Sequence, residues 1–340
     1  MNADPSRKSP QDQPRMSKPV VVYFDIQDFQ PASLEYLRQL FDLRILPDPT
    51  QGSPEIWAEA HALFAPMGYR WDAETLGPCR RLGVIGTPTT GIPHIDADYA
   101  QARNIVICSL RDQQEFLRSI TPTAELTWGM LLCLTRFIPQ AMDMVLAGQW
   151  NGKYFGHKTP RMLSQMSLGV VGLGRLGSLV ACYGRAFCAA VRYFDPYVEN
   201  PAYQRCGSLQ ELASQSDIVS LHVHSTPETR GMIDRGFFQA LPRGSFFLNT
   251  ARGDLVDESA LLQALESGHL AGAALDTLDG EHLPGFAEKL AGHPLLTYAR
   301  SHDNLLLTPH YGGSTRDAWE KTEKRIIDLM IAALKSRHLL

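Results

Sequence analysis

The sequence predicts an α/β protein with two doubly wound parallel sheets, one of them inserted into the chain that forms the other. Three observations support this fold class. Short apolar runs alternate with helical patterns in two successive series, a glycine-rich turn follows the first apolar run of the second series at 172–177, and an amphipathic segment closes the chain at 314–334. Strands that alternate with helical crossovers form parallel sheets, so each series predicts one sheet.

The first series begins after a stretch rich in Pro, Ser, Gln and charged residues, which we interpret as a flexible tail at 1–18. Segments between its apolar runs, such as 33–41 and 54–60, have helical patterns of suitable length for crossovers. The strands expected in this series are 20–24, 43–46, 61–64, 82–85 and 105–108.

The second series predicts six strands, which fit a dinucleotide-binding sheet. They are expected at 168–171, 191–194, 218–223, 245–249, 273–275 and 305–308. Between the two series, 123–147 predicts one long helix, preceded by Thr121-Pro122 and followed by Gly148. Such a helix can join domains or present a face to another subunit.

The closing segment 314–334 carries apolar residues on one helical face. We expect it to return to the first sheet. The first domain would then be discontinuous, formed by 19–121 and 312–340, with the second domain, 122–311, as an insert.

Composition narrows the function classes. The 340 residues suffice for two domains, and 32 basic against 36 acidic residues leave a net charge of −4. Without a basic stripe, nucleic acid is not an expected partner. The apolar stretch 128–134 is shorter than the roughly 20 residues of a membrane span, and 1–18 lack the apolar core of a secretory signal. Six cysteines without CxxC spacing predict reduced thiols in a cytoplasmic protein.

The glycine-rich turn has the setting of a dinucleotide site. A strand pattern precedes it and a helical pattern, 175–187, follows it. Gly172 permits a tight turn, Gly174 lets a pyrophosphate approach the backbone, and Gly177 lets helix and strand pack closely. The amino end of the helix favours phosphate.

Asp195 ends the next strand, 18 residues beyond Gly177, where a carboxylate can accept hydrogen bonds from ribose hydroxyls. The following residues are Pro196 and Tyr197, not arginine, so the sequence favours NAD over NADP.

Three residues further along suggest hydride-transfer chemistry. His310 follows an expected strand and can donate the proton that an alkoxide needs. Glu281, in a turn-rich stretch after another strand, can favour the charged imidazole. Arg252 also follows a strand, and its planar fork can hold a carboxylate in two bonds and polarise a neighbouring carbonyl.

With these motifs in this order, the chain from about residue 20 to 319 resembles the D-isomer-specific 2-hydroxyacid dehydrogenase family. The resemblance rests on 172–177 with Asp195, 221–231, 249–258, 274–276 and 308–313. It implies a Rossmann NAD-binding domain inserted into a discontinuous flavodoxin-like substrate domain.

The resemblance also implies roles for individual residues. Arg252 would bind the substrate carboxylate, His310 would act as acid or base, and Glu281 would pair with it. Thr90 and Gly91 resemble the loop of the first domain whose amides hold the same carboxylate. The residues implied at the NAD site are Gly172, Gly174, Arg175, Leu176, Gly177, Asp195, Pro196, His222, Thr226, Thr229, Thr250, Ala251, Asp276, His310 and Gly312. Among these, Asp276 would hold the nicotinamide carboxamide, with the Ala251 backbone nearby.

Several positions depart from the family pattern and leave the shape of the pocket open. His282 replaces the usual proline after Glu281, His224 replaces a proline, Tyr311 replaces an aliphatic residue, and 283–296 is longer than in the simplest members. No metal is expected. His222 and His224 share a face of an expected strand but lack a third ligand, and His94 with Asp96 is interpreted as fixing its own loop.

The expected function is therefore NAD-dependent interconversion of a 2-oxo acid and a D-2-hydroxy acid, with the domains closing over a cleft and a homodimer formed through the helix around 123–147. Glyoxylate, hydroxypyruvate and 3-phosphoglycerate-type acids remain open as substrates. We expect no further domain after the last helix, and therefore no effector regulation of the kind found in longer phosphoglycerate dehydrogenases. The alternatives are an NAD(H)-sensing, corepressor-like binding protein, a reductase of phosphonate-bearing 2-oxo acids, and a formate dehydrogenase, which has glutamine where Glu281 stands.

Overall fold

The computed structural model describes residues 18–152, 160–188, 190–283 and 285–340, so most of the expected tail lies outside the described residues. The chain divides into two compact units, one formed by Met1–Leu117 with Trp319–Leu340 and the other by Arg118–Ala318. The second unit is thus inserted into the first, as expected. The domain boundaries that the sequence suggested, at 121/122 and 311/312, stay a prediction.

The first unit contains a five-stranded parallel sheet in the order β2-β1-β3-β4-β5. This 2-1-3-4-5 order is that of the flavodoxin-like fold. Buried side chains such as Phe24, Leu63 and Ile85 lie on one side of it, with Trp71 packed among them. The strands are β1 (Val20–Phe24), β2 (Asp42–Leu46), β3 (Ala62–Phe64), β4 (Val84–Gly86) and β5 (Val106–Cys108), and the helices are α1 (Pro31–Leu40), α2 (Pro54–Glu59), α3 (Ala73–Leu76), α4 (Ala97–Ala102) and α5 (Gln114–Leu117).

The last helix, α14 (Arg316–Ser336), packs on the first unit. A Cβ on Gly86, at the end of β4, would lie 2.2 Å from Sδ of Met330, so glycine permits this close approach. The backbone N–H of Gln30 donates to Glu323 at 3.0 Å. The expected return of 314–334 to the first sheet is confirmed.

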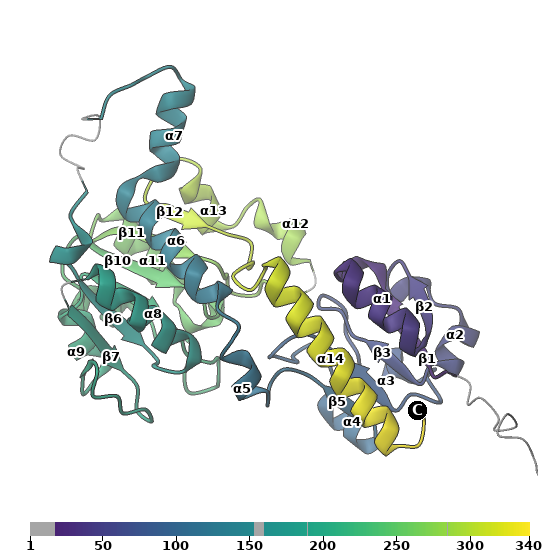
Figure 1. Ribbon diagram of the computed structural model, residues 1–340. Coiled ribbons are helices and arrows are strands. Elements are labelled where there is room, and N and C mark those ends of the chain that lie inside the picture. Colours follow the sequence, from purple (N-terminus) through teal and green to yellow (C-terminus); the bar gives the residue numbers. More distant parts are fainter. Residues whose placement is uncertain (1–17, 153–159, 189, 284) are drawn as a thin grey trace, which may run out of the picture. The chain divides into compact units, whose positions relative to one another are not determined.

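The second unit contains a seven-stranded parallel sheet in the order β12-β11-β10-β9-β6-β7-β8. Counted from β6, this is the 3-2-1-4-5-6 order of the Rossmann fold with one strand added. Strands β12, β11, β10, β6 and β7 are labelled in Figure 1. The strands are β6 (Ser167–Val171), β7 (Ala190–Phe194), β8 (Gln204–Arg205), β9 (Ile218–Leu221), β10 (Ser245–Asn249), β11 (Leu270–Leu275) and β12 (Leu305–Leu307).

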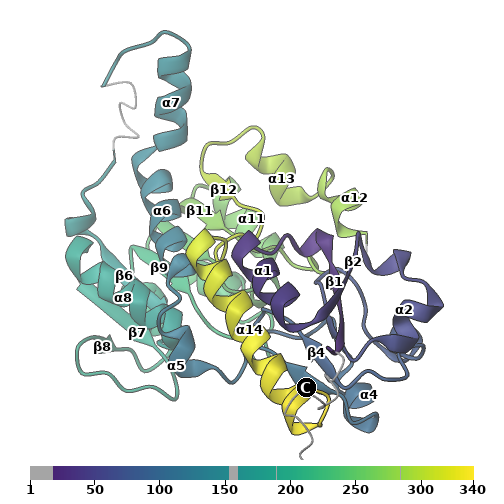
Figure 2. The same ribbon diagram turned by 45° about the vertical axis from the view of Figure 1, so that its right-hand side comes forward.

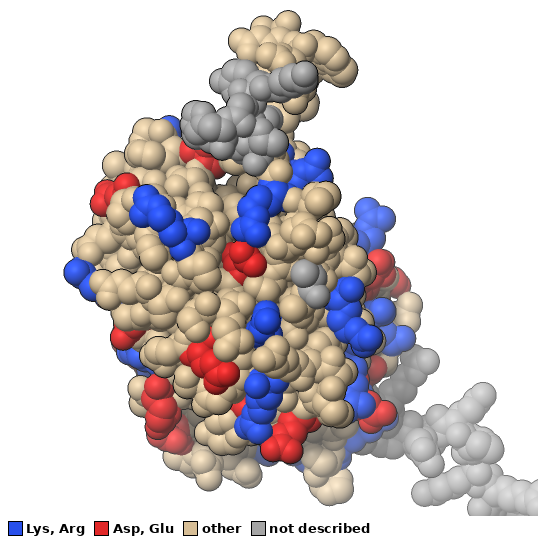
Figure 3. Space-filling view, turned by 90° about the vertical axis from the view of Figure 1, so that its left-hand side faces the viewer, with Lys and Arg blue, Asp and Glu red and all other residues tan. Residues whose placement is uncertain are grey.

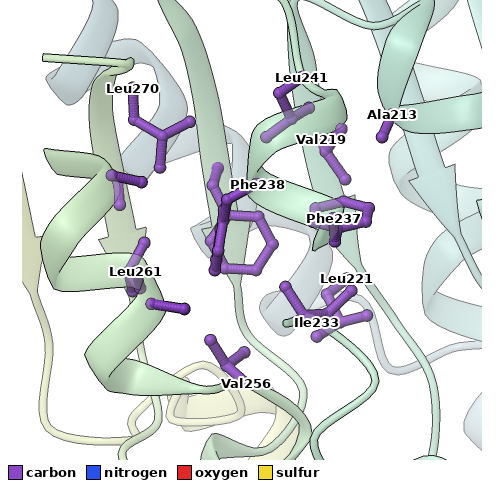
Figure 4. Close-up of a cluster of buried hydrophobic side chains, with 14 of the residues drawn as sticks. Ala213, Val219, Leu221, Ile233, Phe237, Phe238, Leu241, Val256, Leu261 and Leu270 are labelled. Carbon is purple, nitrogen blue, oxygen red and sulfur yellow. The ribbon is translucent and has the colours of Figure 1, made fainter. Parts of the chain in front are cut away.

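Helices cover both faces of this sheet. On one face α6 (Pro122–Arg136) and α8 (Arg175–Phe187) lie side by side (Figures 1 and 2). On the other face, Phe237 and Phe238 of α10 (Arg235–Ala240) lie within an apolar cluster (Figure 4). Their rings contact each other and that of Phe247 edge to face. The remaining helices are α7 (Ile138–Leu146), α9 (Leu209–Ser214), α11 (Glu258–Glu266), α12 (Phe286–Leu290) and α13 (Pro294–Ala299).

Three expectations for the second unit were wrong. The expected helix 123–147 is broken at Phe137, whose φ of 53° is left-handed and cannot continue a helix. The strand expected at 218–223 ends at Leu221, so His222 and His224 do not lie on a strand. The two-residue strand β8 was missed because Gln204-Arg205 has no apolar pattern.

Among the described residues, no single helix is long and apolar enough to cross a membrane. Only the pair Gln114–Arg136 and Ile138–Leu146, bent by 60°, passes the length and composition criteria when taken together. On the face shown in Figure 3, basic and acidic side chains are interspersed.

Candidate active site

The glycine turn joins β6 to α8 and requires glycine at two of its three positions. Gly172 has a φ of +85°, and a Cβ there would lie 2.7 Å from the carbonyl oxygen of His222. A Cβ on Gly177 would lie 1.9 Å from the carbonyl oxygen of Gly172, so glycine lets α8 begin against the turn. At Gly174 nothing lies within 4 Å of such an atom. Open space thus borders the amino end of α8, which suits a phosphate.

The two residues after Gly174 begin the helix. The Arg175 guanidinium donates to the carbonyl oxygen of Ile120 at 2.6 Å, and burial lowers the pKa of Arg175. Leu176 is half-buried. The backbone amides of the first turn of α8 are the groups of these residues that suit a phosphate.

Asp195 follows β7 and is 8 % exposed. One carboxylate oxygen accepts from the backbone N–H of Leu173 at 2.8 Å, and the other accepts from Tyr197 and Val198 at 2.9 and 3.0 Å. Asp195 therefore holds the glycine turn against the end of β7.

Arg205 of β8 is a residue near this position that sequence reasoning missed. Its guanidinium donates to the carbonyl oxygens of Asp195 and Pro196 at 2.9 and 3.1 Å and pairs with Glu199 at 2.8 Å. These bonds direct the charge of Arg205 toward its own loop. Only the pairing of β8 with β7 brings it there, so spacing in the sequence gave no signal.

The segment after β9 packs beside the glycine turn. Nε2 of His222 lies 2.7 Å from Ser220 Oγ, whereas Nδ1 is buried without a partner in the described part of the chain. Burial lowers the pKa of His222 to about 3, so the ring is neutral near pH 7. Thr226 and Thr229 close a tight turn, with Thr229 Oγ1 accepting from the Thr226 N–H at 2.8 Å. An open hollow is lined by Ser225, Thr226, Pro227 and Arg230.

The segment after β10 is held by its own side chains. Asn249 accepts from the Ala251 N–H at 2.9 Å and donates to the carbonyl oxygen of Arg252 at 2.7 Å. Thr250 is hydrogen-bonded to Thr127 of α6 at 2.8 Å. The guanidinium Nη1 of Arg252 donates to the Ala251 carbonyl at 2.6 Å. These bonds fix the backbone on both sides of the Arg252 side chain.

Asp276 directly follows β11 and is 1 % exposed. Its carboxylate accepts from Thr308 Oγ1 at 2.6 Å and from the backbone N–H groups of Tyr311 and Gly312 at 3.1 and 2.9 Å. A Cβ on Gly312 would lie 2.9 Å from this carboxylate. Asp276 therefore fixes the segment that carries His310, and its implied contact with a carboxamide stays a prediction.

Glu281 and His310 are brought together from the ends of β11 and β12. Nδ1 of His310 lies 2.7 Å from Oε1 of Glu281. The Glu281 side chain is 14 % exposed and that of His310 34 %. The partly exposed imidazole is thus anchored by a carboxylate that is largely shielded from water.

A second imidazole lies against the same carboxylate. Nε2 of His282 is 3.5 Å from Oε1 of Glu281, and the rings of His282 and His310 are 5.3 Å apart. Burial lowers the pKa of His282, Glu281 opposes the shift, and the charges of His310 and Arg252 add to it. Of the three expected catalytic residues, the structure brings Glu281 and His310 into contact, and the charge of Arg252 acts on His282 beside them.

A half-buried pair supports the loop that carries Glu281. Glu258 of α11 lies 3.2 Å from Nε2 of His293 and accepts from the Asp279 N–H at 2.9 Å, and burial raises the pKa of Glu258. A Cβ on Gly253 would lie 2.0 Å from the backbone carbon of Leu278, so glycine lets the two loops pack closely. His293 belongs to the longer segment 283–296, which is thus tied to this loop.

Thr90 and Gly91 lie in the first unit, in the segment after β4. Thr89 Oγ1 donates to the Gly91 carbonyl at 2.6 Å, and Nε2 of the buried His94 lies 3.2 Å from the carbonyl oxygen of Ala65. Asp96 caps α4 through the Tyr99 N–H. Hydrogen bonds therefore fix this segment from within its own unit.

The fold and this geometry agree with comparison to known proteins. Residues 128–312 match the family model "D-isomer specific 2-hydroxyacid dehydrogenase, NAD binding domain". The chain belongs to this family, and its second unit holds the family's NAD-binding domain.

Similar proteins include D-3-phosphoglycerate dehydrogenases. That of Bacillus subtilis is 35 % identical over 242 residues, 70 % of this chain and 42 % of the relative. That of Mycobacterium bovis is 31 % identical over 324 residues, 94 % of this chain and 57 % of the relative. The chain thus spans about half the length of the curated relatives it matches.

Two solved structures are similar over almost their whole length. TT0316 protein from Thermus thermophilus has a TM-score of 0.79 at 31 % identity, covering 93 % of this chain and 97 % of its own. A D-lactate dehydrogenase from Aquifex aeolicus, complexed with NAD and lactic acid, has a TM-score of 0.75 at 28 % identity, covering 93 % and 96 %.

Proposed function

We propose that this chain is an NAD-dependent oxidoreductase that interconverts a 2-oxo acid and a D-2-hydroxy acid. The observation that carries the proposal is the 2.7 Å contact between His310 and Glu281, beside His282, on which the charge of Arg252 acts. Membership of the family and the D-lactate dehydrogenase among the similar structures support the same reaction class.

His310 is the proposed acid and base. In reduction its imidazolium gives the proton on Nε2 to the carbonyl oxygen, and in oxidation the neutral ring takes that proton from the hydroxyl. Because Nδ1 is held by Glu281, the ring keeps one orientation.

Arg252 is the proposed carboxylate ligand. Nη1 is engaged by the Ala251 carbonyl, while Nε and Nη2 offer the parallel pair of N–H bonds that a carboxylate accepts. Thr90 and Gly91 would add backbone amides from the first unit.

The residues of the second unit fit a dinucleotide. The open space at Gly174 suits a pyrophosphate, and the unpartnered Nδ1 of His222 lies in the segment next to the glycine turn. The dinucleotide, when bound, would supply or accept the hydride. Asp195 would accept hydrogen bonds from the ribose hydroxyls and repel a 2′-phosphate, and the engaged Arg205 leaves that repulsion uncompensated. We therefore propose NAD rather than NADP.

A homodimer is part of this proposal. Helix α7 projects from its unit (Figures 1 and 2) and has no buried residues, while Ile138, Met142, Val145 and Leu146 are 47–72 % exposed. Covering them with a second copy around 123–147 would remove this apolar surface from water. The cytoplasmic location is likewise proposed, and it agrees with the free cysteines in the described chain.

The proposal is tested by incubating the full chain with NADH or NADPH and a panel of 2-oxo acids, with absorbance at the nicotinamide band as readout. Turnover with NADH and at least one 2-oxo acid is expected. Tight NADH binding without turnover of any acid would instead favour the corepressor-like alternative.

A further inference from the structure

His282, the residue after Glu281, has an imidazole nitrogen that could bind a metal ion and that the proposed reaction does not use. We propose that Glu281, His282 and His310 form a zinc-binding site, and that an ion bound there blocks the acid/base function of His310. This departs from the sequence expectation of no metal. The part concerning inhibition rests on the proposed function, and the part concerning binding does not.

The three side chains meet the distance requirement for a common ion. One donor atom from each lies within 4.8 Å of the others. Zinc bonds of about 2.1 Å in a tetrahedron place neighbouring donors about 3.4 Å apart. Glu281 Oε1 and His282 Nε2 are already 3.5 Å apart. The contact between Glu281 and His310 is 2.7 Å and has to open by about 0.7 Å to reach the same spacing.

The donor set selects the class of metal. Two imidazoles and one carboxylate are the protein ligands of zinc sites that leave a fourth position for water or another small ligand. Mg²⁺ and Ca²⁺ prefer oxygen donors, so they are not expected to compete. Because the Glu281 side chain is largely shielded, water screens the attraction between its carboxylate and a bound ion only weakly.

The loops hold two of the donors in place before any ion arrives. Asp276 binds the backbone on the carboxyl side of His310 through Tyr311 and Gly312, and Glu258 binds the backbone just before Glu281 through Asp279. His282 follows Glu281 directly and already lies against its carboxylate. Little conformational entropy is therefore lost when the three donors close on an ion.

Occupation of the site conflicts with proton transfer. An ion on Nδ1 takes the place of the proton shared with Glu281, and the ring then carries a proton only on Nε2. Loss of that proton would leave an imidazolate rather than a neutral ring, so reduction is blocked. Oxidation is blocked as well, because Nε2 is already protonated.

The binding experiment uses the full chain after treatment with a chelator and dialysis. Zinc chloride is titrated into the wild type, His282→Gln, Glu281→Gln and the control His302→Gln by calorimetry. His302 is an exposed histidine outside the cluster. We expect one site in the wild type and in the control, with affinity at least about 10-fold weaker in the other two variants. Absence of a site in the wild type, or wild-type affinity in His282→Gln, would overturn the proposal.

Inhibition is measured separately. For each variant the zinc concentration that halves its own turnover is determined, and we expect that concentration to rise at least about 10-fold in His282→Gln relative to the wild type. Equal sensitivity of the two proteins would overturn the inhibitory role. If the wild type lacks turnover without zinc, the proposed function fails, while the calorimetric result still decides whether the site exists.

Discussion

Nδ1 of His310 lies 2.7 Å from Oε1 of Glu281, although the two residues are 29 positions apart and leave different strands. The carboxyl ends of parallel strands meet at one edge of a sheet, where ligand sites of this fold gather. Asp276 fixes the His310 side of the contact and Glu258 fixes the Glu281 side. Two carboxylates, the buried Asp276 and the half-buried Glu258, therefore set the pair.

Replacing Arg252 by Ala should lower kcat/KM for 2-oxo acids at least about 100-fold, because a charged partner of the substrate carboxylate is removed. Arg252→Lys keeps the charge but loses the planar fork, so its kcat/KM should lie between those of the wild type and Arg252→Ala. NADH binding, followed by fluorescence, should persist in both. Unchanged turnover in Arg252→Ala would remove this residue from the substrate site.

Replacing Asp195 by Ala should reduce the preference for NADH over NADPH, measured as the ratio of kcat/KM values. The structure adds a stability effect, since three backbone N–H groups lose a charged acceptor at a cost of about 1–3 kcal/mol. Thermal unfolding of the same variant measures that loss. An undiminished ratio in a folded variant contradicts the ribose assignment.

His222 should make the protein sensitive to acid. Its folded pKa of about 3 lies below the ordinary value near 6.5, so between these pH values the unfolded chain binds more protons. The free energy of unfolding should therefore fall as pH drops below about 6.5, by about 1 kcal/mol per pH unit. Denaturant unfolding of His222→Gln should show a shallower slope, whereas the exposed His224→Gln should keep it. Identical slopes in all three proteins would count against a buried neutral ring.

The Glu258–His293 pair should position Glu281 without touching substrate. Glu258→Ala leaves the Asp279 N–H and His293 without their partner, so we expect kcat to fall several-fold with little change in KM, and stability to fall by about 1–2 kcal/mol. Glu266→Ala, an exposed position at the end of the same helix, is the matched control. A loss confined to stability would show that the pair only supports the fold.

Local patterns in the sequence predicted much of the fold and of the site. The Gly172–Gly177 turn and the strand ends that carry Arg252, Glu281 and His310 each have a nearby signal in glycine spacing or an apolar run. The break at Phe137, the strand that carries Arg205 and the Glu258–His293 pair have none. They depend on a single left-handed residue, a polar two-residue strand and a contact between distant segments.

The most direct measurement is a double-mutant cycle on kcat with the wild type, Glu281→Gln, His310→Asn and the double variant. Asparagine suits the left-handed φ of 50° at position 310. Loss of the acid should cost about 10²–10⁴-fold, and once His310 is gone Glu281→Gln should cost almost nothing further. A double variant about as active as His310→Asn is the expected result. Losses that multiply, or wild-type activity in His310→Asn, would contradict a proton-transfer unit formed by these two residues.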